Sequence, residues 1–146
     1  MTLLSERLRQ SAEPLIVHHP VRWLALCAIC SPYLIGSAMK FMDYSAAVKE
    51  MESYGLLPAA PFAAAVIFMG VALSLMVITG FLRWIGALAL ATFNIVATLA
   101  ALPFWQMTPG PDRLMALRVF VEHIALSGAL VLVAWEDVKE ARDGHG

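Results

Sequence analysis

The chain has 146 residues, of which 60% are hydrophobic and only 14% are charged, and its formal net charge is −1. Soluble domains carry about 45–50% apolar and about 25% charged residues. The composition therefore excludes an ordinary soluble domain and predicts an integral membrane protein in contact with the lipid bilayer. The balanced charge and the lack of a basic run indicate no nucleic-acid partner, and we expect a single membrane domain over residues 1–146.

The first fifteen or so residues hold scattered leucines between the charged residues Glu6, Arg7, Arg9 and Glu13. We expect a short N-terminal helix on the membrane surface there. Four apolar stretches follow, at residues 21–39, 60–80, 84–105 and 114–135. Each reaches the roughly 20 residues that a membrane-crossing helix needs. The predicted fold class is an all-α membrane protein, an up-down four-transmembrane-helix bundle with short N-terminal and outer interfacial helices.

The connections between the spans support this topology. The sequence TGFLRW between the second and third spans predicts a tight turn, and PFWQMTPGPD before the fourth span contains three prolines and one glycine. In the loop after the first span, apolar side chains recur at helical spacing, which predicts the interfacial helix. These side chains are Tyr44, Ala47, Val48 and Met51, and we expect Gly55 and Pro58 to end the helix.

Counting basic residues predicts a cytoplasmic N-terminus and a cytoplasmic C-terminus. On the cytoplasmic side this arrangement places Arg7, Arg9, Arg22, Arg83, Lys139 and Arg142. On the outer side it places Lys40, Lys49, Arg113 and Arg118.

The fourth span carries ionisable residues inside its apolar sequence, LRVFVEHIALSG. Arg118 and Glu122 are four residues apart and can form an ion pair. A charge at membrane depth costs about 2.5–3.5 kcal/mol, so we expect both to face the bundle interior. Three interpretations stay open: a structural pair, a pocket for a polar headgroup or redox ligand, and side chains that reach the membrane surface without a partner.

In the predicted topology, residues at the outer ends of the first and third spans reach the same depth as that cluster. They are Tyr33, Lys40, Asp43 and Trp105. In the third span, Asn94 is expected to hydrogen-bond to another helix, with Ser74 or Thr79 as its partner.

His123 has no second histidine or cysteine at metal-ligand spacing, so we expect no metal site. Cys27 and Cys30 form a C-x-x-C pair in the first span. Their side chains diverge on a helix, which favours packing residues over a redox disulfide. Their redox activity stays open.

The stretch YLIGSAMKFMDYSAAVKEMESYGLLP resembles the DoxX family of small four-helix bacterial membrane proteins. The similarity covers residues 20–136 and includes a glycine-rich second span, the glycine–arginine turn, and an aromatic pair after the third span. The marker residues are Gly36, Lys40, Asp43, Gly55, Pro58, Ser127 and Gly128. The chain departs from many relatives in having Phe68 and Met69 in place of an acidic residue, and Leu102 and Pro103 in place of a histidine.

The resemblance implies a redox-linked subunit in the bacterial cytoplasmic (inner) membrane. It leads us to expect a quinone as ligand, no covalently bound cofactor, and a protein partner or homo-oligomer. In this hypothesis Glu122 and His123 are catalytic, and the ligand-binding residues are Tyr33, Lys40, Asp43, Trp105 and Arg118. Whether the chain is an enzyme stays open, and at most it is a quinone-linked oxidoreductase subunit. The alternatives are a non-catalytic membrane anchor or assembly factor, and a small-solute or lipid transporter.

Overall fold

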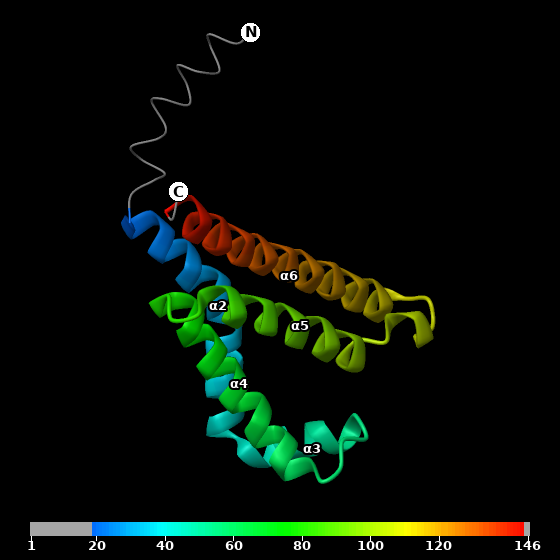
Figure 1. Ribbon diagram of the computed structural model, residues 1–146. Coiled ribbons are helices and arrows are strands. Elements are labelled where there is room, and N and C mark those ends of the chain that lie inside the picture. The colour runs from blue at the N-terminus through cyan, green and yellow to red at the C-terminus, as the bar shows by residue number, and fades with distance from the viewer. Residues whose placement is uncertain (1–18, 145–146) are drawn as a thin grey trace, which may run out of the picture.

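The computed structural model describes residues 19–144, which are helical nearly throughout and contain no strand (Figure 1). The elements are α2 (His19–Met42), α3 (Tyr44–Ser53), α4 (Ala59–Thr79), α5 (Arg83–Ala101), the short 3₁₀ helix η1 (Phe104–Gln106) and α6 (Pro111–Asp143). The expected N-terminal surface helix lies outside the described residues.

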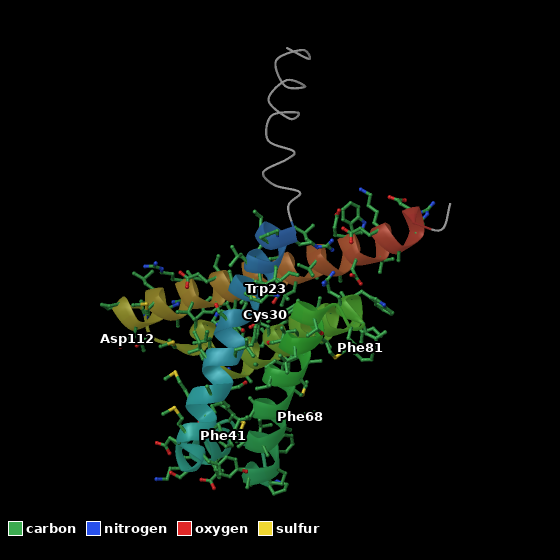
Figure 2. The ribbon with its side chains drawn as sticks, turned by 90° about the vertical axis from the view of Figure 1, so that its left-hand side faces the viewer. Trp23, Cys30, Phe41, Phe68, Phe81 and Asp112 are labelled. Atoms are coloured by element: carbon green, nitrogen blue, oxygen red, sulfur yellow. The ribbon has the colours of Figure 1, made fainter. Side chains whose placement is uncertain are left out.

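The four long helices α2, α4, α5 and α6 are long and apolar enough to cross a membrane, as the sequence predicts. Their outer surfaces carry large apolar side chains, and Figure 2 shows Phe41 on α2, Phe68 on α4 and Phe81 in the turn after α4. These three side chains are 74%, 72% and 69% exposed, respectively. Such a surface suits lipid and not water. The chain is therefore a multi-pass all-α membrane protein.

The short helix α3 is confirmed between the first two spans. The Asp43 carboxylate accepts a hydrogen bond from the Ala46 N–H, which caps the start of α3. Ala47 and Met51 on its apolar face are buried against α4. Gly55, with a φ of 74°, then turns the chain toward α4.

The long helices pair as two hairpins. The first hairpin consists of α2 and α4, with α3 packed across its end, and the second hairpin consists of α5 and α6. Figure 1 shows the hairpins meeting near the start of α2 and the end of α4, and diverging toward α3 on one side and η1 on the other. Because α2 and α6 share only a short contact, the expected up-down bundle is open at one end. We call the two sides of the molecule the joined end and the open end.

Small residues allow the helices to approach within these pairs. A Cβ atom on Gly70 would collide with the Ser37 side chain, so this glycine sets the contact between α2 and α4. A Cβ atom on Gly86 would lie 2.8 Å from the Met76 Cβ atom, so Gly86 sets the contact between α4 and α5. Close backbone approach at small residues is the usual packing of helices in membranes.

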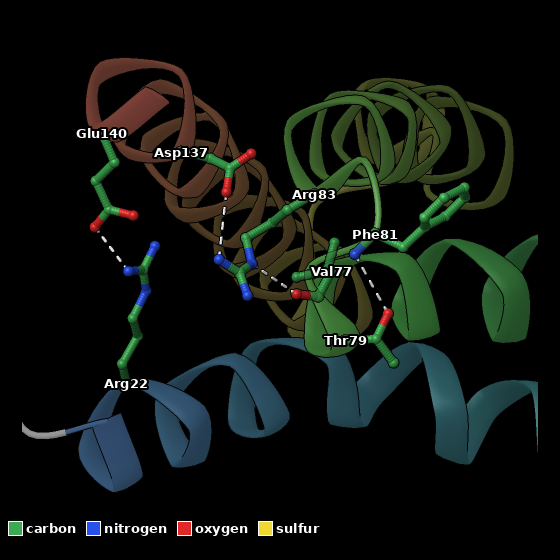
Figure 3. Close-up of polar contacts among 7 residues, drawn as sticks. All are labelled: Arg22, Val77, Thr79, Phe81, Arg83, Asp137 and Glu140. Carbon is green, nitrogen blue, oxygen red and sulfur yellow. Dashed lines mark hydrogen bonds and ion pairs between the residues drawn. The ribbon is translucent and has the colours of Figure 1, made fainter. Parts of the chain in front are cut away.

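Arg83 fixes the joined end. Its Nε donates a hydrogen bond of 2.9 Å to the carbonyl oxygen of Val77 near the end of α4, and its Nη1 lies 3.3 Å from the Asp137 Oδ1 on α6 (Figure 3). Since Arg83 itself begins α5, one side chain holds three helices. Beside it, Arg22 on α2 forms an ion pair with Glu140 on α6 at 2.7 Å.

We predict that the Arg83–Asp137 pair stabilises the junction of the hairpins. Both side chains are mostly buried, at 17% and 22% exposure, so Arg83→Met should lower the free energy of unfolding by about 2–3 kcal/mol. Asp137→Asn should cost less because the Val77 contact survives. A double-mutant cycle in mixed micelles measures the coupling. Arg142→Met, at an exposed position on α6, is the control. Equal decreases in the free energy of unfolding in all three variants would contradict the prediction.

Candidate functional site

A cavity of about 560 Å³ lies between the two hairpins on the side of the open end. Helices α2, α3 and α4 form one wall and α5 and α6 form the other. Most of the wall is apolar, and the polar side chains are Tyr33, Ser37, Lys40, Glu50, Tyr54, Asn94, Thr98 and His123. An apolar cavity with few polar groups is the usual form of a small-molecule site.

On the first wall, Lys40 at the end of α2 forms an ion pair with Glu50 on α3. The Tyr54 hydroxyl donates a hydrogen bond of 3.1 Å to the other carboxylate oxygen of Glu50. The pairing holds the Lys40 ammonium against α3 at the cavity wall. Burial raises the pKa of Tyr54 above its ordinary value, and the nearby Glu50 carboxylate raises it further.

Tyr33 lies deeper on the same wall and is 8% exposed. Its hydroxyl is buried and has no hydrogen-bond partner among residues 19–144. A buried hydroxyl without a partner is costly, and this oxygen has almost no accessible surface, so it lies behind the cavity wall and not in the cavity.

On the second wall, Asn94 ties α5 to α6. Its amide nitrogen donates hydrogen bonds of 2.8 Å to the Ser127 hydroxyl oxygen and to the carbonyl oxygen of His123. The prediction that Asn94 bonds to another helix is confirmed, but the expected partners were wrong. Ser74 has no hydrogen-bond partner among the described residues, and Thr79 donates to the Leu75 carbonyl of its own helix.

His123 lines the cavity from α6 and is half-buried. Its Nδ1 lies 2.7 Å from the carbonyl oxygen of Val119, one turn earlier. A carbonyl oxygen only accepts hydrogen bonds, so Nδ1 carries the proton and Nε2 is left as the acceptor in the neutral ring. The backbone contact thus fixes the tautomer of His123.

The expected ion pair of Arg118 and Glu122 is present, with the Arg118 Nε 3.0 Å from the Glu122 Oε1. The expectation that both side chains face the bundle interior was wrong, because they are 75% and 58% exposed. Both lie on the side of α6 opposite buried Ala116 and Ser127, which face the rest of the protein. The pair therefore lies outside the cavity.

Asp43 and Trp105 also lie outside the cavity wall. Asp43 is occupied in capping α3, and its hydrogen bonds with Ala46 and Ser45 lower the pKa of the carboxyl group. The Trp105 ring packs against Phe104 and Phe120 at the connection between α5 and α6. Of the expected site residues, the structure therefore brings together Tyr33, Lys40 and His123.

Sequence reasoning missed three polar residues of the wall, namely Glu50, Tyr54 and Thr98. Glu50 and Tyr54 are four residues apart, which could have placed them on one face of the interfacial helix. Thr98 is one turn after Asn94, and its hydroxyl donates a hydrogen bond of 2.6 Å to the Asn94 carbonyl oxygen.

A second hollow, of about 640 Å³, lies at the joined end. Its basic residues Arg22 and Arg83 are both engaged by carboxylates of α6. Cys27 and Cys30 lie nearby on α2 as free thiols, and Cys30 is fully buried in the core. Neither feature offers an available polar group comparable to His123.

These features define a four-span membrane protein with an amphipathic cavity between two helical hairpins. The DoxX family model matches residues 22–103, more than half of the chain, and the chain belongs to the DoxX family. The match covers α2, α3, α4 and α5, whereas His123 and the rest of α6 lie beyond it. No curated protein and no solved structure matches the chain.

We predict that Glu50→Gln lowers the pKa of Tyr54 by removing the neighbouring negative charge, while burial keeps it above the ordinary value of about 10. Stability linked to neutral Tyr54 is present below about pH 10 and is lost as the pH rises through the folded-state pKa. Tyrosinate absorbance during alkaline titration measures the shift. Subtracting the titration curve of Tyr54→Phe isolates the absorbance change that belongs to Tyr54. An unchanged Tyr54 titration midpoint in Glu50→Gln would contradict the predicted effect of the carboxylate.

Proposed function

We propose that this protein is a redox-linked membrane subunit that binds a quinone in the cavity between its hairpins. One observation carries the proposal: polar side chains from both hairpins, including Lys40 and His123, line a single, mainly apolar cavity. Its volume of about 560 Å³ lies within the range of about 300–1,000 Å³ usual for small-molecule sites.

The wall matches the chemistry of a quinone, which has a flat apolar ring with an oxygen at either side. Phe62 and Phe93 supply apolar surface from the two hairpins. The Lys40 ammonium, which lines the cavity, is a hydrogen-bond donor suited to a quinone oxygen. An isoprenoid tail would extend into lipid from such a cavity.

In this proposal His123 is the proton acceptor. Its Nε2 accepts a proton from a quinol hydroxyl, while the Nδ1–H contact with the Val119 carbonyl holds the ring in place. Glu50 positions Lys40. As the quinol is oxidised to the quinone, its second proton passes to solvent and its two electrons pass to a partner protein that acts as the oxidant, because the sequence shows no haem, flavin or iron–sulfur signature. The proposal places proton transfer at His123 and not at the exposed Glu122.

The proposed cellular setting is the bacterial inner membrane with both termini in the cytoplasm. The joined end, with Arg22 and Arg83, then faces the cytoplasm, and the open end with α3 faces outward. This agrees with the excess of basic residues on the cytoplasmic side.

One observation favours the second candidate function, a membrane anchor for a partner enzyme. Helix α6 continues as a charged, exposed segment from Glu136 to Asp143. Asp137 and Glu140 in this segment hold Arg83 and Arg22, so truncation would also weaken the fold. Reversing the charges of Glu136 and Arg142 tests docking without touching those pairs. Loss of a co-purifying enzyme with intact quinone binding would support the anchor function.

We predict that His123→Phe weakens the binding of a short-chain ubiquinone by about tenfold or more, because one strong hydrogen-bonding group is lost from the cavity. Phenylalanine keeps the ring volume, so the fold should survive. Equilibrium dialysis against the purified full-length chain measures the dissociation constant.

Glu122→Gln is the matched control, since it lies one residue away but outside the cavity. It should leave the dissociation constant unchanged. The reverse pattern, with weak binding in Glu122→Gln and unchanged binding in His123→Phe, would refute the cavity as the quinone site.

A further inference from the structure

Helix α6 carries two heptad-spaced rows of residues on opposite sides. The inner row is buried or half-buried and consists of Ala116, Phe120, His123, Ser127, Leu130 and Ala134. The outer row is exposed throughout and consists of Arg118, Val121, Ala125, Gly128, Leu132 and Trp135. The inner row packs within the second hairpin, whereas nothing among residues 19–144 covers the outer row. Spacings of three and four residues are those of helix–helix contacts.

The outer row begins at Arg118, which forms with the adjacent Glu122 a charged pair that is poorly suited to lipid. Arg118 and its neighbour Glu122 are 75% and 58% exposed within the fourth span. Their mutual contact uses only the Arg118 Nε and the Glu122 Oε1. The other guanidinium nitrogens and the second carboxylate oxygen have no further partner among the described residues. Within a membrane, such groups favour a protein partner over lipid.

The middle of the outer row consists of small residues. Ala125 and Gly128 are both exposed, and a Cβ atom on Gly128 would meet nothing within 4 Å. The chain's own packing therefore does not require glycine at this position. Small side chains between Val121 and Leu132 allow the backbone of a second helix to approach closely.

We propose that the outer row of α6 is the interface of a homodimer, in which the α6 helices of two copies pack in parallel. Both copies have the same orientation in the membrane, so a two-fold axis brings Arg118 and Glu122 of each to the same depth. The surface is complementary to itself because it carries one cation and one anion. Because the Arg118 Nε lies 3.0 Å from the Glu122 Oε1, the two charges lie at about the same level on each copy, and the four charges alternate around the two-fold axis.

A charge-reversal experiment tests the pairing across the interface. Two differently tagged full-length copies are expressed together and captured through one tag from a mild detergent. Arg118→Glu and Glu122→Arg each place like charges on both copies, so self-capture should fall at least about tenfold. Expressing one variant with the other restores opposite charges, and capture should return to the parent level. Both side chains are exposed, so both variants should fold.

Three further variants separate the interface from general effects. Gly128→Leu should reduce capture at least about tenfold, and Val131→Leu, exposed on α6 but off the outer row, should not. Lys49→Glu, a charge reversal on α3, should also leave capture unchanged. A monomeric parent chain, undiminished self-capture of either charge variant, or failure of the mixed pair to recover would each overturn the proposal.

Discussion

The contact of Arg83 with the Val77 carbonyl and with Asp137 is the constraint on which the rest of the structure depends. It joins the end of α4, the start of α5 and the last third of α6 at one point. Because the hairpins are fixed there and α2 hardly touches α6 elsewhere, their far ends diverge. The cavity therefore results from the position of the Arg83 contacts at one end of the hairpins. In a four-helix bundle packed along its whole length, side chains would fill this space.

The two walls of the cavity are stabilised in different ways. Asn94 and Ser127 join α5 to α6 through buried hydrogen bonds, and the same contacts brace the backbone at His123. On the other wall, α3 supplies Glu50 and Tyr54 to hold Lys40. An interfacial helix of low apolar content thus brings a carboxylate to the site, which a membrane span could carry only at greater cost.

Apolar periodicity and length were sufficient to predict the four spans and the α3 helix, because lipid leaves few other ways to satisfy the backbone. The pairing of Arg118 with Glu122 also followed from spacing alone. The direction in which that pair points did not, since it depends on which side of α6 packs against α5. Glu50 was missed because its role requires α3 to fold back onto α2, a tertiary contact without a local signal.

The unequal lengths of the helices link the cavity to the thickness of the bilayer. Helix α5 has 19 residues, whereas α6 has 33. At 1.5 Å per residue, α5 spans about 28 Å, close to a hydrocarbon core of about 30 Å, and α6 exceeds it by about 20 Å. Part of this excess is the charged segment from Glu136 to Asp143, so hydrophobic matching acts on an apolar length of α6 that is shorter than the whole helix. We expect this matching to influence the tilt of each hairpin. A change in lipid chain length would alter the angle between them, so the width of the opening depends on the host membrane as well as on the sequence.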